Sequence, residues 1–177
     1  NPAPKMAALA LEATLALPLG KSVDVISEGT CLIIGAEAAI TAATDLCETL
    51  AVTALVPNAD LVPLDRRFDC VVGNVRNVSG ALGSFNVKID ALQQVTPGGR
   101  GAFTLSDPLE GAASSCDIIL DLSGTTALVP APEKREGYLR ADPSHAPAIA
   151  KAVFEASQLI GTFEKPLYVR LEPSLCA

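Results

Sequence analysis

A single glycine marks the place where a phosphate-binding turn would lie. It ends the apolar run Thr30–Gly35 and is followed by Ala36, Glu37 and Ala38. In the pattern G-x-G-x-x-G, the glycines permit a tight turn and let a pyrophosphate approach the backbone at a helix N-terminus. Only the first glycine is present here, and Glu37 brings a negative charge to the position of the pyrophosphate. We interpret the segment as a turn and a helix start, with degenerate cofactor contacts at Gly35–Ala38.

A second group of candidate contacts follows another apolar run. Ligands of α/β proteins gather at the carboxyl ends of parallel strands. Asp121–Thr125 ends such a run, so Ser123 and Gly124 are the remaining candidate cofactor-binding residues. The acid that would bind a ribose after the second strand is missing, because Ala51–Pro57 ends in proline and Asp60 lies beyond it.

The cysteines indicate free thiols. Their number is odd, and no two of them form a C-x-x-C pair. Thiols of this kind suit a reducing cytoplasm, which is the expected location. An iron–sulfur cluster needs four thiolates, typically with several of them a few residues apart. Cys31, Cys47 and Cys70 lie on separate predicted elements, and Cys176 directly precedes the final alanine. The five cysteines are Cys31, Cys47, Cys70, Cys116 and Cys176.

The remaining polar candidates favour structure over catalysis. His145 is the only histidine, and it precedes a predicted helix for which Asp142 or Ser144 is the expected cap. Adjacent residues rarely orient a nucleophile and a base toward each other, so we predict no catalytic Ser144–His145 pair. The basic cluster Asp65–Arg67 is interpreted as a solvated loop tip, with binding of a phosphate or a partner's carboxylate as the alternative.

Hydrophobic periodicity predicts the elements that position these residues. A continuous apolar strand, an alanine-rich helix and a second strand form a βαβ unit, which implies a parallel pair with a right-handed crossover. Their predicted ranges are Thr30–Gly35, Ala36–Leu50 and Ala51–Pro57. Short strands bounded by glycine and proline then predict an inserted antiparallel meander over about residues 68–105: Phe68–Val78, Ser84–Ile89 and Gly101–Leu105.

Further segments complete the expected domain, residues 1–177. A buried strand is predicted at Cys116–Gly124, followed by a surface crossing at Pro130–Pro143. Helices are predicted at Met6–Leu17 and Pro147–Ile160, and a last strand at Pro166–Leu171. The predicted fold class is therefore α/β, a Rossmann-like parallel sheet with crossover helices and the meander.

Composition excludes several kinds of partner. The chain has 177 residues, 49% of them hydrophobic, which is enough for one sizeable core. Its net charge of -7 argues against nucleic acid, which requires a basic surface. The apolar runs have strand length, so no membrane span is expected. Oligomeric state is left open.

Two longer segments resemble known proteins. TCLIIGAEAAITAATDLCETLAVTALVP is similar to the nucleotide-binding start of the flavoprotein disulfide reductase-like fold. VRNVSGALGSFNVKI and GTFEKPLYVRLEPSLCA resemble the segment before the cluster-binding region of multidomain 4Fe-4S ferredoxin-type proteins, and parts of heterodisulfide reductase A-type subunits. The resemblance covers about residues 30–177. It implies a fragment of a longer chain whose cluster-binding domain follows residue 177, with Cys176 at its threshold as a metal ligand.

Three hypotheses follow from these observations. The leading one is an accessory domain of a 4Fe-4S electron-transfer protein, which positions its own C-terminal ferredoxin module or docks a redox protein. It expects no cluster and no catalysis within these residues. The second is an oxidoreductase domain that binds FAD or NAD through a non-standard phosphate loop; FAD is a less favoured cofactor than the 4Fe-4S cluster of the longer chain. The third is a protein-interaction module whose outer meander strand pairs with a partner.

Overall fold

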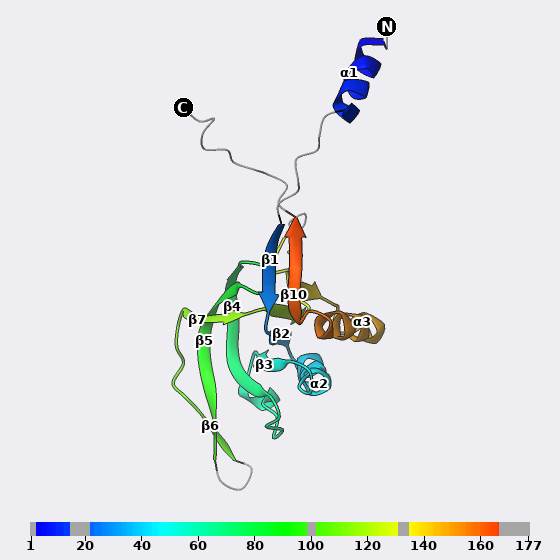
Figure 1. Cartoon of the computed structure of the whole chain (residues 1–177). Helices are drawn as coiled ribbons and strands as arrows, with labels where there is room; N and C mark the ends of the chain where they lie inside the picture. The colour runs from blue at the N-terminus through cyan, green and yellow to red at the C-terminus, as the bar shows by residue number, and fades with distance from the viewer. Residues whose placement is uncertain (1–2, 15–21, 99–101, 131–134, 167–177) are drawn as a thin grey trace. The chain divides into compact units, whose positions relative to one another are not determined.

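The computed structural model describes residues 3–14, 22–98, 102–130 and 135–166. Two compact units are present (Figure 1). One comprises Asn1–Asp24 together with Glu164–Ala177, and the other comprises Val25–Phe163. The second unit contains the main sheet and every cavity discussed below.

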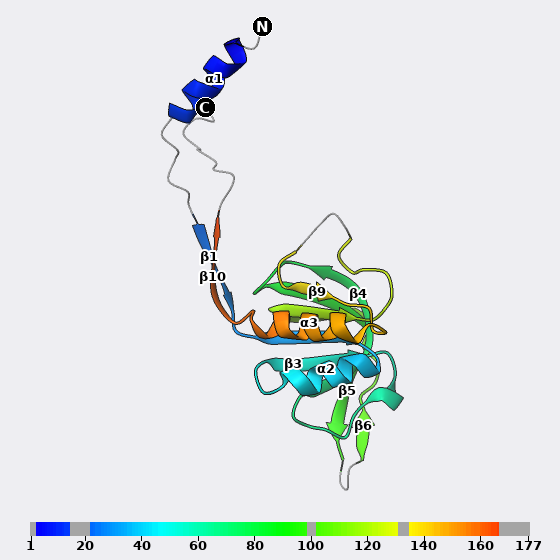
Figure 2. The ribbon, with the colours of Figure 1, turned by 90° about the vertical axis from the view of Figure 1, so that its right-hand side faces the viewer.

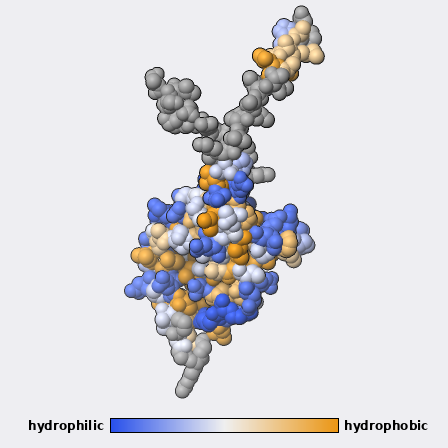
Figure 3. All heavy atoms as spheres, viewed as in Figure 1, coloured by the Kyte–Doolittle hydropathy of each residue, from blue (hydrophilic) through white to orange (hydrophobic). Residues whose placement is uncertain are grey.

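In the first unit, helix α1 covers Ala3–Thr14, three residues earlier than the predicted start. The end of the predicted helix, residues 15–17, lies outside the described residues. The apolar side chains Met6, Leu9 and Leu11 of α1 are exposed, as the apolar colour of this helix in Figure 3 indicates, and Leu11 is 67% accessible. Across the described residues, no helix has both the length and the apolar character needed to span a membrane.

The βαβ unit is confirmed. Strand β2 covers Thr30–Gly35, helix α2 covers Glu37–Leu46 and strand β3 covers Ala51–Val56. The two strands are parallel, with Thr30 opposite Ala51. The helix ends four residues before the predicted Leu50, and the chain then turns before β3 begins. Alanine side chains of α2 are fully buried, which brings the helix close to the sheet.

Five neighbouring strands of the main sheet are parallel, in the order β4-β3-β2-β8-β9. Strand β8 covers Ile118–Leu122 and β9 covers Tyr138–Arg140. The chain moves from β2 outward to β3 and β4, and later returns to the other side of β2 as β8. The carboxyl ends of β2 and β8 therefore lie side by side where the strand order reverses. Ligands of open α/β sheets bind at such a point.

The antiparallel strands belong to this same sheet. Strand β4, Asp69–Ser79, pairs in parallel with β3 and then antiparallel with β5, Phe85–Pro97. Two further strands, β6 at Phe103–Leu105 and β7 at Ala112–Cys116, also pair with β5. The register with β5 shifts at Gly73, just after the pairing with β3 ends, and again between Val75 and Asn77; such bulges bend a strand. The predicted meander is confirmed in type, but β5 continues well beyond Ile89.

Different structures cover the two faces of the sheet. Helices α2 and α3 pack on one face and contact each other (Figure 2). Side chains of β4, β5 and β7 pack on the other face against Leu32, Ile34 and Leu55. Because both faces are covered, Cys31–Gly35 of β2 are buried without polar alternation, and all of β8 is buried, including its one polar residue, Asp121. Among the described residues, α2 is the only helix that connects two neighbouring parallel strands. The expected second crossover helix is absent there, because β3 and β4 are joined by a loop with a short turn at Ala59–Leu61.

The last elements differ from the sequence predictions at their ends. Helix α3 covers Ala146–Ser157, so the predicted end at Ile160 is three residues too late. Strand β10 covers Gly161–Pro166 and pairs with β1, Ser22–Ser27, which was not predicted. The predicted strand Pro166–Leu171 shares only its first residue with β10, and the rest of it lies outside the described residues.

Candidate functional site

The carboxyl ends of β2 and β8 approach too closely for a side chain between them. Gly35 stands opposite Leu122, and its backbone φ is +154°. A Cβ atom on Gly35 would lie 2.7 Å from the carbonyl oxygen of Leu122, which is closer than such atoms can pack. The sheet itself therefore requires this glycine. Its presence does not by itself indicate a bound phosphate.

The start of α2 opposes an anion. Its N-cap, Ala36, has no side-chain hydrogen bond to the helix, and Glu37 occupies the first turn with its side chain exposed. A carboxylate at this position stabilises a helix by about 0.3–1 kcal/mol. The same negative charge repels a phosphate approaching the helix N-terminus. Ala38 is half-buried and packs against the core under the helices.

At the end of β8, Asp121 is fully buried and its carboxylate is surrounded by donors from its own chain. Oδ1 accepts hydrogen bonds from the backbone N–H of Ser123 at 3.0 Å and from its hydroxyl at 2.6 Å. Oδ2 accepts the phenolic hydrogen of Tyr138 at 2.6 Å and lies 3.5 Å from Nε of Arg140. A buried carboxylate is tolerable only with such partners. These donors leave Asp121 engaged within the protein.

The donors to Asp121 also hold the loop that follows β8. The phenolic oxygen of Tyr138 accepts a hydrogen bond from the backbone N–H of Leu128 at 3.1 Å. The guanidinium of Arg140 donates to the carbonyl oxygen of Thr125. Burial, and then the hydrogen bond to Asp121, raises the pKa of Tyr138 to about 12. The loop 123–128 is thus fixed near its start, middle and end.

A cavity of about 340 Å³ opens between this loop and strand β4. Ile34 and Leu55 contribute apolar surface from the central strands, and Asn74 and Leu128 line the sides. The cavity lies at the carboxyl ends of the strands, where the strand order reverses. Its position is that of a ligand site in an open α/β sheet.

The structure brings together part of the predicted cofactor site. Two of the six predicted residues line the 340 Å³ cavity, namely Gly35 and Ser123. A third residue, Gly124, lines a different hollow of about 410 Å³ beside Arg140 and Asp142. The lining of neither cavity includes the others: Ala36, Glu37 and Ala38.

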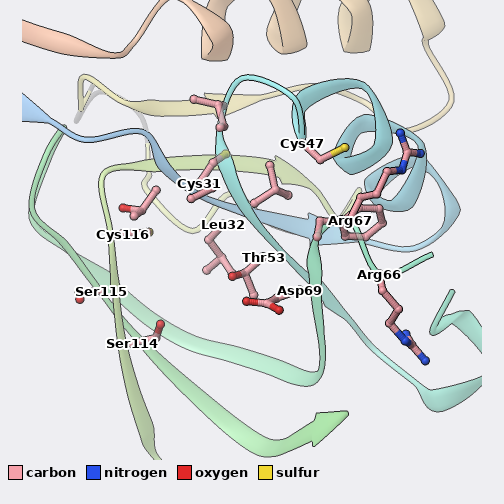
Figure 4. A pocket seen from close by; sticks show the side chains of 15 residues that line it. Cys31, Leu32, Cys47, Thr53, Arg66, Arg67, Asp69, Ser114, Ser115 and Cys116 are labelled. Atoms are coloured by element: carbon pink, nitrogen blue, oxygen red, sulfur yellow. The ribbon is translucent and has the colours of Figure 1, made fainter. Parts of the chain in front are cut away.

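Another hollow, of about 490 Å³, lies at the opposite ends of the strands (Figure 4). Leu32, Thr53 and Asp69 stand side by side there on β2, β3 and β4. At its margin, Arg67 pairs with Asp65 at 2.7 Å. Arg66 donates to the carbonyl oxygen of Pro63 at 2.8 Å. The basic cluster is therefore held by its own loop.

The described thiols are suited to packing more than to chemistry. Cys31 and Cys116 are buried, and burial raises the pKa of each thiol to about 12. Burial also raises the pKa of Cys70 to about 11. The thiolate is the form that binds metals, and it is disfavoured at these three positions. No group of three or more His, Cys, Asp and Glu side chains able to hold a metal occurs in the described parts of the chain. Cys176 lies outside them, so its predicted role stays a prediction.

His145 is itself the cap of α3, which corrects the expectation for Asp142 or Ser144. Its Nδ1 accepts a hydrogen bond from the backbone N–H of Ala148 at 3.2 Å. The hydroxyl of Ser144 donates instead to Asp142, at 2.7 Å. Ser144 and His145 thus serve the turn before the helix.

Three residues of the site were not found from the sequence: Asn74, Tyr138 and Arg140. The last two lie in the stretch interpreted as a surface crossing, where the three-residue strand β9 carries little periodicity. Asn74 follows the bulge at Gly73, and a glycine inside a strand pattern was the available signal.

No protein-family model matches the chain, and neither does any curated protein sequence.

Proposed function

We propose that this chain is an accessory domain of a 4Fe-4S electron-transfer protein. It positions a ferredoxin module of the same protein, or docks a redox partner, and neither binds the cluster nor catalyses a reaction itself. The iron–sulfur context rests on the resemblance of VRNVSGALGSFNVKI and GTFEKPLYVRLEPSLCA to the segment that precedes the cluster region in such proteins.

The proposal includes a Rossmann-like ancestry for the sheet. Its support is the parallel order β4-β3-β2-β8-β9, which matches the order 3-2-1-4-5 of dinucleotide-binding folds. In such a fold the diphosphate contacts bare backbone at the first glycine turn. The expected ligand would therefore meet this chain at Gly35 and the start of α2.

The observation that carries the proposal is that Gly35 and the start of α2 lack the features that would hold a diphosphate. The close approach of the Leu122 carbonyl oxygen accounts for the glycine at position 35 without a phosphate, and Glu37 brings a carboxylate to the first turn of α2. The nearby Asp121 is engaged by Ser123 and Tyr138. Together these features oppose a dinucleotide and favour a fold retained for its shape.

The pairing of β1 with β10 favours a positioning role. Through these strands the chain enters and leaves the α/β unit along neighbouring paths. Paired entry and exit strands let a domain be attached at one place on a larger protein. This arrangement suits a module that presents or orients another.

The proposal is tested on the polypeptide as its gene encodes it, purified without oxygen. We expect iron and acid-labile sulfide in that protein, and neither in residues 1–177 alone. Titration calorimetry of residues 1–177 with NAD, FAD and ADP separates the proposal from the dinucleotide-binding alternative. At micromolar ligand concentrations we expect no heat of binding, and Glu37→Gly leaves this unchanged because Ile40 still stands where the third glycine of the pattern would be. Iron-free protein, or saturable binding of FAD or NAD at these concentrations, overturns the proposal.

A further inference from the structure

We propose that the cavity at the carboxyl ends of β2, β3 and β8, beside the middle of β4, binds a purine nucleoside, a ligand without phosphate. This site goes beyond the accessory role proposed above and is independent of it. The cavity lies on the face of the sheet opposite α2, so a ligand there does not need the helix N-terminus that Glu37 protects.

The wall of the cavity is fixed before any ligand arrives. Loop 123–128 is tied by Ser123 to Asp121, by Thr125 to Arg140 and by Leu128 to Tyr138. Burying an ion pair is costly, and apolar residues in its place often serve stability as well or better. Because stability alone does not require the buried Asp121 network, we infer that its role is to hold loop 123–128 in position as a wall of the cavity. A preformed wall lowers the entropy lost on binding.

The cavity has the polarity and the size of a nucleoside site. Ile34 and Leu55 offer an apolar surface, and no Lys or Arg lines the cavity. Such a surface takes the face of a planar ring and gives no counter-charge to a phosphate. The volume of about 340 Å³ is near the lower end of the range for small-molecule sites, roughly 300–1,000 Å³. A nucleoside suits this volume better than a dinucleotide.

The hydrogen bonds from Thr125 to Ser123 and from Ser123 to Asp121 run in one direction. The Asp121 carboxylate only accepts, so the Ser123 hydroxyl must donate to it. The Thr125 hydroxyl, 2.9 Å from Ser123 Oγ, then donates to Ser123 and keeps its lone pairs. Thr125 therefore offers an acceptor, as a ribose hydroxyl or an exocyclic amine requires.

The amide of Asn74 is available to a ligand. Its side chain is exposed at the cavity and makes no hydrogen bond within the part of the chain that the structure describes. An asparagine amide presents a donor beside an acceptor, which is complementary to N7 and the N6 amino group of adenine. The bulge at Gly73 turns β4 at this point and places Asn74 beside the apolar surface.

The test is an NMR titration of 15N-labelled protein with adenosine, uridine and AMP. We expect adenosine to shift the amide signals of Gly35, Gly73 and Ser123 in a saturable way at millimolar concentration, and uridine to bind more weakly. AMP should bind no more tightly than adenosine. Asn74→Ala should raise the dissociation constant about tenfold. Asn77→Ala is the matched control, since Asn77 is an exposed residue of the same strand that does not line the cavity, and it should leave binding unchanged.

Each contrary outcome overturns the inference. Absence of saturable shifts with adenosine shows that the cavity is not a nucleoside site. Equal loss of binding in Asn74→Ala and Asn77→Ala, or no loss in either, excludes recognition by Asn74. Binding of AMP more than tenfold tighter than adenosine means that a phosphate is recognised. None of these results bears on the iron content, so failure here is distinguishable from failure of the accessory role.

Discussion

Gly35 shows how a single residue can carry a signal with two meanings. In the sequence it stands where a phosphate-binding turn begins, and in the structure its missing side chain makes room for the carbonyl oxygen of Leu122. Both requirements select glycine, so the residue type alone does not distinguish them. Glu37 distinguishes them better, because its charge at a helix N-terminus opposes a bound phosphate and has no effect on the packing of Gly35 against Leu122.

Gly35→Ala should destabilise the protein because both the φ of +154° and the contact with Leu122 exclude a Cβ atom. We expect a loss of more than about 1–3 kcal/mol, the usual cost of an unfavourable φ alone. The measurement is urea unfolding followed by circular dichroism. Gly161→Ala is the matched control, since Gly161 has a φ of +124° but no atom within 4 Å of the added Cβ. Equal losses for the two variants would show that the contact with Leu122 contributes nothing.

The Tyr138–Asp121 hydrogen bond should be visible in the pH dependence of stability. The pKa of Tyr138 is raised from 10.0 to about 12, so the folded protein keeps this proton over a range in which the unfolded chain loses it. Stability from this group is complete below pH 10 and is lost as the pH rises through 12. Tyr138→Phe should therefore be less stable at neutral pH, with a shallower decline between these values. Unfolding free energies measured across the alkaline range give the comparison, and parallel curves for the two proteins would contradict it.

Among the elements, those with strong periodicity were predictable and those set by tertiary contacts were not. Thr30–Gly35 is predicted to the residue because a strand buried on both faces is a continuous apolar run. The predicted strand Cys116–Gly124 is divided in the structure, since β7 ends at Cys116 and β8 begins at Ile118. The cause is Asp117, whose carboxylate binds a distant turn, and no local pattern contains that contact.

Asp117→Ala should destabilise the junction between β7 and β8. Oδ2 of Asp117 accepts hydrogen bonds from the backbone N–H of Glu28 and from the N–H and hydroxyl of Thr30, at 2.9 to 3.0 Å. Losing a charged acceptor for these donors costs on the order of 1–3 kcal/mol. Thermal unfolding measures the loss. Asp69→Ala is the control, an exposed carboxylate without a hydrogen bond among the described residues, and it should change stability little. A similar effect for both would show that only net charge matters.

The cap of α3 gives a second prediction for an element. His145→Ala removes the imidazole Nδ1 acceptor for the N–H of Ala148 but keeps the carbonyl oxygen of residue 145, which accepts from the same N–H at 2.9 Å. We therefore expect a loss near the lower end of about 0.5–2 kcal/mol. His145→Asn supplies another capping acceptor and should restore most of this stability. Hydrogen exchange of the first-turn amides of α3 provides the readout. Faster exchange in both variants alike would argue that the imidazole has another role.

For the whole molecule, the strand order follows from the sequence only in part. The βαβ unit fixes β2 beside β3, and the later apolar run at Ile118–Leu122 has the character of a central strand. Its place on the other side of β2 depends on contacts between segments more than eighty residues apart, such as Thr30 with Asp117. The candidate site, too, could be predicted from the sequence only in part. Gly35 and Ser123 were found because each ends an apolar run, whereas Tyr138 and Asn74 needed the folded chain to reveal them.

The most direct test of the accessory role is the iron and acid-labile sulfide content of the polypeptide as its gene encodes it, purified without oxygen. The account predicts both elements in the ratio of a 4Fe-4S cluster, together with their absence from residues 1–177 prepared in the same way. Gene-encoded protein that holds neither iron nor sulfide would contradict it.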